Sequence, residues 1–575
     1  MRSQQIQTLT RQLRLRGPSR GAALSVATLD PVLARLYAAR GVTNERELDY
    51  SLARLAPVGA LGGIEQSVAV LQRHRRSRII VVGDFDADGA TSTALVLRCL
   101  RRFGFDDCGY LVPNRFEFGY GLTPEIVDEA AKRRPQLLVT VDNGVSSCAG
   151  VNRARDLGIE VLITDHHLPG KDMPATTILN PNLPDNGFPS PHLAGVGVAF
   201  YLMAALGRAL EQEGLTGAAR IPADYLDLVA LGTIADVVRL DHNNRILVTQ
   251  GLQRIRAGRC VPGIHALLEQ SGRATARVCS SDLGFAAGPR LNAAGRLDDM
   301  SIGIECLLTD DASVAADLAR QLDAINRERR NIEAGMREQA YAFVDTMQKT
   351  AMPACVCLFN GGWHQGIVGL IAARVRERCH RPVIAFARDK DDMLKGSGRS
   401  VPGVHIRDLL EAVATSCPQL IERFGGHAMA AGLSLAEANL SAFSIEVAAQ
   451  LERLYPDADF SGAIVTDGAL SANALNLSFA RQLRDAGPWG AGFPEPVFSG
   501  TFDIVEQRTV GESHLKMRVS PRDHHAVLDA IAFNQAGPAY RGSVELVYRL
   551  DVNEFRGIES PQLVVEQIVS PHYVA

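Results

Sequence analysis

Acidic and imidazole side chains recur directly after short apolar runs in the first half of the chain. These residues are Asp84, Asp86, Asp88, Asp142, Asp165, His166, His167 and Asp236. Several carboxylates that converge on one place repel each other, and their ionisation is costly unless cations neutralise them. Carboxylate oxygens combined with imidazole nitrogens suit Mn²⁺ or Mg²⁺. The set therefore predicts a divalent metal site.

So many candidate ligands exceed the needs of one ion, which favours a pair. Two ions about 3.5–4 Å apart share a bridging carboxylate and a water, and they lower the pKa of that water towards about 7. The resulting hydroxide can attack phosphorus in line, so the expected reaction is phosphodiester hydrolysis. Taken one at a time, an Asp after a strand is equally explained as a turn former or a helix cap, as Asp88 before the segment 90–97 illustrates. Four such ends together favour the metal site.

The apolar runs predict the elements that position these residues. The runs are 79–82, 137–141, 161–164 and 228–235. Helical stretches separate several of them, and this alternation indicates an open α/β sheet with parallel strands. Ligands bind such sheets at the carboxyl ends of the strands. The last run can instead finish a helix, which would move Asp236 off a strand end without removing it from the crevice.

Length and composition set the wider limits. With 575 residues the chain needs three or four packed units, and 46% hydrophobic and 22% charged residues are ordinary globular values. The formal net charge of −4 excludes a general basic field, so a polyanion must meet a local patch. Ten scattered cysteines and the absence of a long apolar run favour a reduced, cytoplasmic protein without a membrane span.

The strings DFDADG, VDNG, TDHH and GTIADVV, in this order, resemble the four motifs of DHH phosphoesterases. The resemblance implies a pair of Mn²⁺ or Mg²⁺ ions held by Asp86, Asp88, Asp142, His166 and Asp236. The resemblance also implies that Asp142 is a catalytic residue that bridges the two ions. It implies that His167 faces the scissile phosphate as a catalytic and substrate-binding group. Asp84, in the aspartate-rich first motif of RecJ-type members, is expected to ligate a metal or to orient water. Many relatives have His where this chain has Val82, which removes one nitrogen ligand.

The second half of the chain resembles the smaller α/β domain associated with DHH domains. The similar strings are GGWHQGIVGLIAARV, GSGRSVPGVHIRDLL and RFGGHAMAAGLSL. Glycines allow the backbone to approach an anion closely, and an arginine beside them can bind phosphate. The substrate-binding residues expected here are Ser397, Arg399, Gly425, Gly426 and His427.

Two further segments offer arginines to a nucleic acid backbone. GPRLNAAGRLDD resembles a RecJ-type motif, and its Arg290 and Arg296 are expected to bind DNA phosphates. In VPNRFEFGYGL, Arg115 stands among aromatic residues that could stack on bases, although buried aromatics explain the same pattern.

A long connecting helix is predicted between the two halves of the chain. Residues 305–345 contain no proline and carry apolar side chains at helical spacing.

From about residue 460, five short strand-like runs indicate a small closed β unit. The resemblance implies that this unit is an OB-fold that binds single-stranded nucleic acid. The alternative is that it serves only as a structural cap. The preceding PWGAGFPEPVF is similar to a RecJ-type linker motif in which Asn usually follows the second glycine, where this chain has Phe493. The expected ranges are 1–50 for an N-terminal segment, 51–300 for the DHH domain, 301–348 for the connecting helix, 349–455 for the DHH-associated domain and 456–575 for the OB-like barrel.

The resemblance as a whole implies a single-stranded-DNA-specific 5′→3′ exonuclease that releases 5′-mononucleotides in DNA repair and recombination. A single-strand-binding protein and a helicase are conceivable partners. Two other classes stay open at this point. A DHH phosphatase for small substrates such as pyrophosphate, short oligonucleotides or cyclic dinucleotides would share the metal site without needing the C-terminal β region. A catalytically inactive replication scaffold would show eroded motifs.

Overall fold

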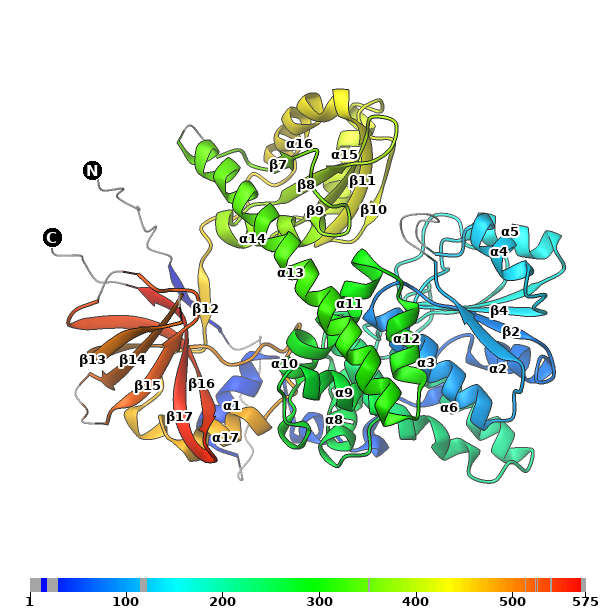
Figure 1. Ribbon diagram of the computed structural model, residues 1–575, viewed down its shortest axis with the longest axis horizontal. Coiled ribbons are helices and arrows are strands. Elements are labelled where there is room, and N and C mark those ends of the chain that lie inside the picture. Colours follow the sequence, from blue (N-terminus) through cyan, green and yellow to red (C-terminus); the bar gives the residue numbers. More distant parts are fainter. Residues whose placement is uncertain are drawn as a thin grey trace. The chain divides into compact units, whose positions relative to one another are not determined.

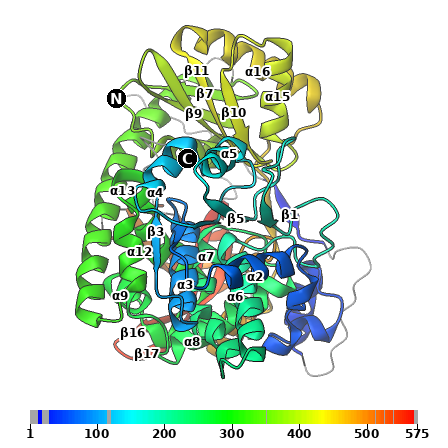
Figure 2. The ribbon, with the colours of Figure 1, turned by 90° about the vertical axis from the view of Figure 1, so that its right-hand side faces the viewer.

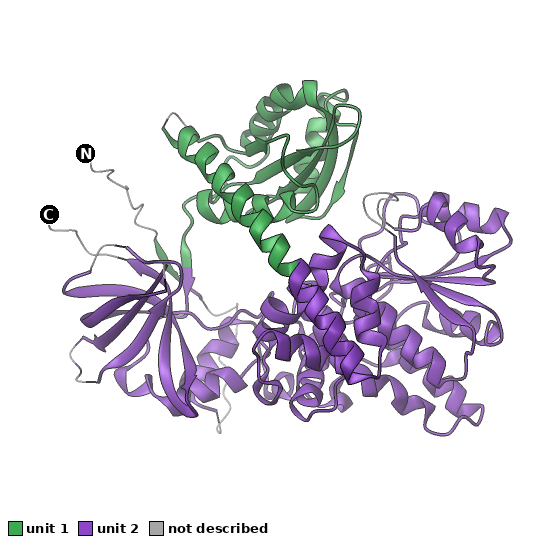
Figure 3. Cartoon of the chain, viewed as in Figure 1, with its two compact units in different colours: residues 1–14, 326–464 green, residues 15–325, 465–575 purple. Residues whose placement is uncertain are grey.

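The chain forms two compact units, each with its own sheet and apolar core. The computed structural model describes residues 12–17, 29–113, 121–349, 352–511, 513–522, 524, 526–537 and 540–569. One unit comprises residues 1–14 and 326–464, and the other comprises residues 15–325 and 465–575 (Figure 3). Among the described helices, none is both long and apolar enough to cross a membrane.

A five-stranded parallel sheet organises the larger unit, with the order β3-β2-β4-β5-β6. Its strands are β2 (Ile79–Val82), β3 (Cys108–Leu111), β4 (Leu137–Val141), β5 (Glu160–Thr164) and β6 (Thr177–Leu179). Helices α4 (Pro124–Ala131) and α5 (Cys148–Asp156) cover one face of the sheet (Figures 1 and 2). Helices α2 (Ile64–Arg73), α3 (Ala87–Arg102) and α6 (Gly195–Gln212) cover the other. The α/β class and the first three predicted strands are confirmed.

The fourth apolar run is not a strand but ends a helix, the alternative that its sequence left open: residues 228–235 belong to helix α7 (Leu226–Ala235), and Asp236 is its C-cap. Every residue from Leu226 to Thr233 is buried. A continuous apolar run looks the same whether it forms a buried strand or a buried helix, because neither leaves a polar face to reveal its period. The sheet is completed instead by the short strands β3 and β6.

Helix α7 also buries a carboxyl group in its first turn. One oxygen of Asp227 accepts a hydrogen bond from the backbone N–H of Val261 at 2.7 Å, and the other has no hydrogen-bond partner among the described residues. Burial raises the pKa of Asp227 to about 6. A carboxyl whose pKa is raised by folding stabilises the fold at low pH, and this contribution is lost as the pH rises through the folded-state value.

We therefore expect Asp227→Asn to become progressively more stable relative to the natural chain between about pH 4 and pH 6.5, by on the order of 3 kcal/mol. The reason is that the amide cannot ionise, whereas the buried carboxylate must. Thermal unfolding midpoints measured across this range test the expectation. The exposed Asp172→Asn serves as control. The expectation would be contradicted if the stability difference between Asp227→Asn and the natural chain did not depend on pH.

A helical region follows the sheet in the larger unit. It contains α8 (His242–Arg256), α9 (Pro262–Gln270), α10 (Ser280–Asp282), a π-helical turn (Leu283–Ala287), α11 (Gly288–Leu297) and α12 (Ser301–Leu308). The predicted long helix is α13 (Ala312–Gln348). It begins later than expected because the side chain of Asp311 accepts the backbone N–H of Ser313 at 2.7 Å, which caps a new helix.

The smaller unit contains a mixed five-stranded sheet with the order β10-β11-β9-β8-β7. Its strands are β7 (Val356–Phe359), β8 (Val383–Arg388), β9 (Met393–Arg399), β10 (Arg423–Gly426) and β11 (Ala430–Ala436), and its helices are α14 (Val368–Cys379), α15 (Ile406–Ser416) and α16 (Leu440–Leu454). Only the pair β7 and β8 is parallel. The predicted smaller α/β domain is thereby confirmed.

The predicted C-terminal β unit is a closed barrel with the order β13-β14-β15-β17-β16. Its strands are β13 (Phe498–Val510), β14 (His514–Pro521), β15 (Leu528–Ala532), β16 (Ser543–Phe555) and β17 (Ile558–Val569). Helix α17 (Leu477–Asp485) precedes it, and helix α1 (Pro31–Ala39) packs nearby, since the Tyr37 hydroxyl donates to the carbonyl of Ala486 at 2.8 Å.

The remaining short elements connect these parts. Strands β1 (Leu13–Leu15) and β12 (Ile464–Thr466) pair with each other. The 3₁₀ helices are Glu45–Leu48, Leu52–Arg54, Val58–Ala60, Ala218–Tyr225, Thr275–Arg277, Glu437–Asn439 and Ala472–Ala474.

Phe493, in the segment PWGAGFPEPVF that precedes the barrel, is completely buried in an aromatic stack. Its ring lies parallel to Trp489, with centroids 5.2 Å apart, and 6.1 Å from the ring of Tyr37. The guanidinium of Arg245 lies 4.4 Å from the centre of the Phe493 ring. The stack therefore joins helix α1, helix α8 and the segment that leads into the barrel.

Candidate metal centre

Residues from three strand ends and from the end of α7 meet at the carboxyl edge of the parallel sheet. Three groups of side chains each have ligand atoms within 4.8 Å of one another. The groups are Asp84 with Asp86 and Asp142; Asp142 with His166 and His167; and Asp88 with His166 and Asp236. Asp142 is shared by the first two groups and His166 by the last two. The structure thus brings together all the residues predicted as metal ligands.

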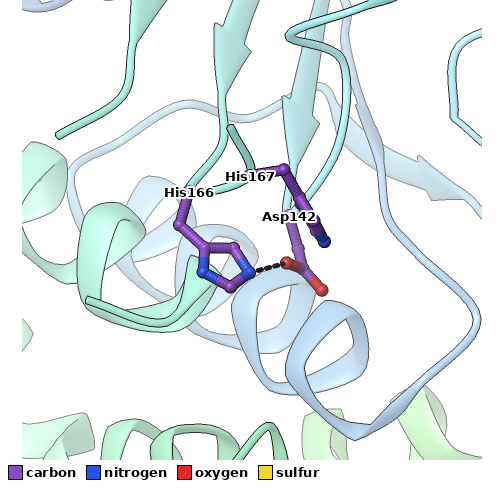
Figure 4. A group of neighbouring side chains, drawn as sticks. All are labelled: Asp142, His166 and His167. Carbon is purple, nitrogen blue, oxygen red and sulfur yellow. Dashed lines mark ion pairs between the residues drawn. The ribbon is translucent and has the colours of Figure 1, made fainter. Parts of the chain in front are cut away.

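His166 lies at the centre of this arrangement. Its Nε2 is 3.1 Å from Oδ1 of Asp142, a contact drawn in Figure 4, and 3.5 Å from Oδ2 of Asp236. Oδ2 of Asp88 lies 4.0 Å away. Within the described part of the chain, no lysine or arginine lies within 4.0 Å of the carboxylates of Asp86, Asp88 or Asp236.

The loop after β2 is folded so that its carboxylates point to one side. Asp86 caps helix α3 by accepting the backbone N–H of Gly89 at 2.9 Å. A Cβ at Gly89 would lie 2.5–2.7 Å from the backbone of Asp84, so only glycine permits this tight turn. The first motif is therefore shaped by local capping and close backbone packing.

The N-terminus of helix α6 holds the third carboxylate of this loop. Both oxygens of Asp88 accept backbone N–H groups, from Gly195 at 2.6 Å and from Val196 at 3.0 Å. The exposed N–H groups at a helix start favour a negative charge. Gly195 is also required sterically, because a Cβ there would lie 2.6 Å from Cβ of Asp142.

Asp142 adopts the left-handed backbone conformation, with φ of +63°. Among residues other than glycine, Asp and Asn tolerate this conformation best. The turn at Asp142 occurs directly after β4, and it directs the side chain towards His166 (Figure 4). The backbone at this position thus favours the same residue type that a bridging ligand requires.

The electrostatics of the centre disfavour so many negative charges in the absence of cations. Burial, followed by the charges of Asp236 and Asp86, raises the pKa of Asp88 well above its ordinary value. Burial, followed by the charge of Asp88, does the same for Asp142, and burial also raises the pKa of Asp236. Burial lowers the pKa of His166, which keeps its imidazole neutral and able to coordinate a metal.

The donor set fits divalent metal ions. It offers carboxylate oxygens and imidazole nitrogen, and no thiolate belongs to any of the three groups of described residues. Such oxygen-rich sites suit Mn²⁺ or Mg²⁺, and Mn²⁺ also accepts nitrogen ligands. The buried Nε2 of His166 makes no hydrogen bond with the described residues, as expected of an atom that is available for coordination.

Asp165 has a different environment from the other acids of the site. It is almost completely buried and accepts hydrogen bonds from the backbone N–H groups of Val145, His166 and His167 at 2.7–3.0 Å. Its Oδ1 also contacts Nδ1 of His167 at 2.7 Å. Burial disfavours a charge on Asp165, but the hydrogen bond and charge of His167 outweigh it and lower the pKa of this carboxyl.

Asp165 also changes the proton affinity of His167. Burial disfavours the charged imidazole, but the hydrogen bond to Asp165 and the surrounding carboxylates raise the pKa of His167 to about 9. Asp165 is one of the ligand-type residues of the sequence, but no catalytic or binding role was predicted for it. The signal in the sequence was its place directly before the two histidines, where its carboxylate can accept their backbone N–H groups.

Val82 lies at the end of β2 with its side chain buried in the apolar cluster on the α4 and α5 face of the sheet. No nitrogen ligand comes from this strand. The first group of candidate ligands accordingly consists of the carboxylates Asp84, Asp86 and Asp142 alone.

The predicted DNA-binding arginines of the larger unit differ in their burial and contacts. Arg290 is buried and forms an ion pair with Asp323 at 2.8 Å, and it donates to the carbonyl of Ala286 at 2.7 Å. The charge of Arg290 is thus already neutralised inside the helical region, and its expected contact with DNA phosphates stays a prediction. Arg296 is half-buried in the last turn of α11, and Arg115 lies outside the described residues.

The predicted substrate-binding residues of the smaller unit gather at one end of its sheet. Nη1 of Arg399 donates to Oγ of Ser397 at 3.0 Å, and Arg399 pairs across the sheet with Ala430. The carbonyl of Ala430 in turn accepts the backbone N–H of His427 at 2.8 Å. Gly425, Gly426 and His427 are exposed at the neighbouring hairpin. Burial lowers the pKa of Arg399, followed by the positive charge of Arg376.

Comparison with known protein families identifies three regions of the chain. Residues 78–233 match the DHH family, N-terminal domain, and residues 351–453 match the DHHA1 domain. Residues 466–567 match the RecJ OB domain. The resemblance seen in the sequence motifs therefore extends to all the major folded parts.

Whole-chain relatives have the same organisation. The single-stranded-DNA-specific exonuclease RecJ of Salmonella typhimurium is 52% identical over 571 residues, which cover 97% of this chain and 99% of that protein. The Escherichia coli protein of the same name is 51% identical with the same coverage. The crystal structure of RecJ in complex with Mn²⁺ from Thermus thermophilus is 31% identical with a TM-score of 0.77, covering 95% of this chain and 76% of that one. The chain belongs to the RecJ family of single-stranded-DNA-specific exonucleases.

Proposed function

We propose that the protein is a single-stranded-DNA-specific exonuclease that hydrolyses phosphodiester bonds from the 5′ end and releases 5′-mononucleotides, in DNA repair and recombination. The observation that carries this proposal is the buried convergence of carboxylates and His166 at one edge of the parallel sheet. The identity of about half of all residues with exonucleases over nearly their whole length supports the substrate class.

We assign the ligand role to Asp84, Asp86, Asp88, Asp142, His166 and Asp236, which would hold two divalent ions; Asp142 belongs to two of the three groups and would serve both ions. Two divalent ions, when bound, supply Lewis acidity at the phosphate and activate a water for attack. Related structures from Thermus thermophilus contain Mn²⁺ or Mg²⁺, which supports the choice of these two metals.

The remaining residues of the site bind and orient the substrate. His167, kept protonated by Asp165, donates to a phosphate oxygen and opposes its charge. Arg296, Arg115 and the group around Arg399 hold further phosphates of the strand, and the barrel binds single-stranded DNA through its surface. A cytoplasmic location, and a single-strand-binding protein and a helicase as partners, complete the proposal.

Hydrolysis of 5′-labelled oligonucleotides, with Mn²⁺, with Mg²⁺ and with chelator, tests the function. We expect labelled mononucleotide as the first product from a single strand, little product from a blunt duplex, and none with chelator. Asp236→Asn should lose the activity, because it removes a carboxylate oxygen 3.5 Å from His166. Release of long fragments, or cleavage that survives chelation, would contradict the proposal.

Replacement of Asp165 by Asn is expected to lower kcat by about 10- to 100-fold while metal binding persists, since loss of the partner of a site histidine typically has this effect. The physical reason is that the neutral amide of this variant cannot stabilise the positive charge of His167. Steady-state kinetics and Mn²⁺ titration of the same preparation separate the two effects. His167→Asn should reduce kcat similarly, and a double variant much worse than either single variant would argue against a shared role.

A further inference from the structure

Helix α11 contacts the metal loop through the side chain of Asn292. Oδ1 of Asn292 accepts the backbone N–H of Ala87 at 2.8 Å. Ala87 stands between the candidate ligands Asp86 and Asp88 and is the first residue of helix α3. The N–H groups at a helix start have no partner within the helix. Asn292, distant in the sequence, therefore completes the cap that Asp86 begins at Gly89.

A second contact shows that α11 and the metal loop are closely packed. A Cβ at Gly295 would lie 1.6 Å from the carbonyl oxygen of Phe85, so the two backbones touch at this point. Asn292 and Gly295 are three residues apart and thus share one face of α11. This face also carries Arg296, four residues after Asn292. The helix itself is anchored by the buried ion pair between Arg290 and Asp323.

We propose that Asn292 is a positioning residue for the metal centre: it holds the loop of Asp84, Asp86 and Asp88 in the conformation that binds metal. The inference rests on the proposed function, because it concerns the same site. The amide suits this position because it supplies an acceptor for Ala87 without adding another negative charge beside the carboxylates. Without that acceptor, the Ala87 N–H would be left without its partner, which is costly in a half-buried place.

Binding of Mn²⁺ alone to the metal-free protein tests the proposal, with the electron paramagnetic resonance signal of free Mn²⁺ as the readout. We expect Asn292→Leu, which keeps the size of the side chain but removes the acceptor, to weaken Mn²⁺ binding by about 10- to 100-fold. Asn292→Asp keeps an acceptor oxygen and adds a charge that favours cations. Its Mn²⁺ affinity should therefore exceed that of Asn292→Leu.

The matched control is Asn476→Leu, because Asn476 caps helix α17 by accepting the backbone N–H of Phe479 at 2.9 Å. It loses the same kind of hydrogen bond away from the metal centre. We expect it to lower the thermal unfolding midpoint without changing Mn²⁺ affinity.

The outcomes separate this inference from the proposed function. The natural chain should bind Mn²⁺, and Asp142→Asn should not. Given that result, an unchanged Mn²⁺ affinity of folded Asn292→Leu would overturn the positioning role alone. An equal loss of Mn²⁺ affinity in Asn476→Leu would do the same. If the natural chain binds no Mn²⁺, the proposed metal-dependent function itself fails. If Asn292→Leu does not fold, Asn292→Ser, whose shorter side chain cannot span the same gap, is measured in its place with the same expected loss.

Discussion

Asp142→Asn should lose at least about a thousandfold of the nuclease activity and yet unfold at a higher temperature than the natural chain when metal is absent. The activity falls because Asn offers a weaker, uncharged ligand in place of the carboxylate shared by two groups of ligands. The stability rises because burial and neighbouring charges raise the pKa of Asp142. A carboxyl whose pKa is raised by folding destabilises the folded state once the pH exceeds its ordinary value, and the amide removes this cost.

The backbone makes this substitution a clean test, since Asn adopts the positive φ of Asp142 as readily as Asp does. Asp185→Asn is the matched control: Asp185 also has a positive φ, of +61°, but it is exposed and belongs to none of the three groups of candidate ligands. We expect the control to change neither activity nor melting temperature. Calorimetry in chelator and nuclease assays in Mn²⁺ measure the two effects. A lower melting temperature of metal-free Asp142→Asn would contradict the charge argument.

Phe493→Ala is expected to destabilise the larger unit by about 3–5 kcal/mol, the usual range for a fully buried Phe. The ring contacts Trp489, Tyr37 and Arg245, so its removal leaves a cavity where helix α1, helix α8 and the linker meet. The thermal unfolding midpoint of the purified protein should fall accordingly. Phe493→Asn should be about as harmful because the aromatic stack around it stays unchanged.

The exposed Phe285, with 78% of its surface accessible, provides the control for this loss of an aromatic ring. Phe285→Ala should alter stability by less than about 0.5 kcal/mol, as is typical of exposed positions. A Phe493→Ala variant that unfolds at the same temperature as the natural chain would show that the stack contributes little to joining these elements.

The sequence alone determined the α/β class, three strands of the parallel sheet, the barrel and the metal-binding residue types. It did so because short β-branched runs end directly at ligand-type residues, and adjacent parallel strands bring such ends to one edge. It left the element that carries Asp236 undecided between a strand and a helix, because a fully buried apolar run has no exposed face to reveal its period. The residue was still predicted to lie in the crevice, and it does.

Tertiary structure decided the roles that depend on partners distant in the sequence. Arg290 was predicted to bind phosphate, and only the folded chain shows that Asp323 lies 2.8 Å from its guanidinium. No role was predicted for Asn292, because its contact with Ala87 exists only in the folded chain. The type of a residue determines which bonds its side chain can form. Only the tertiary structure determines which partner groups lie close enough for those bonds.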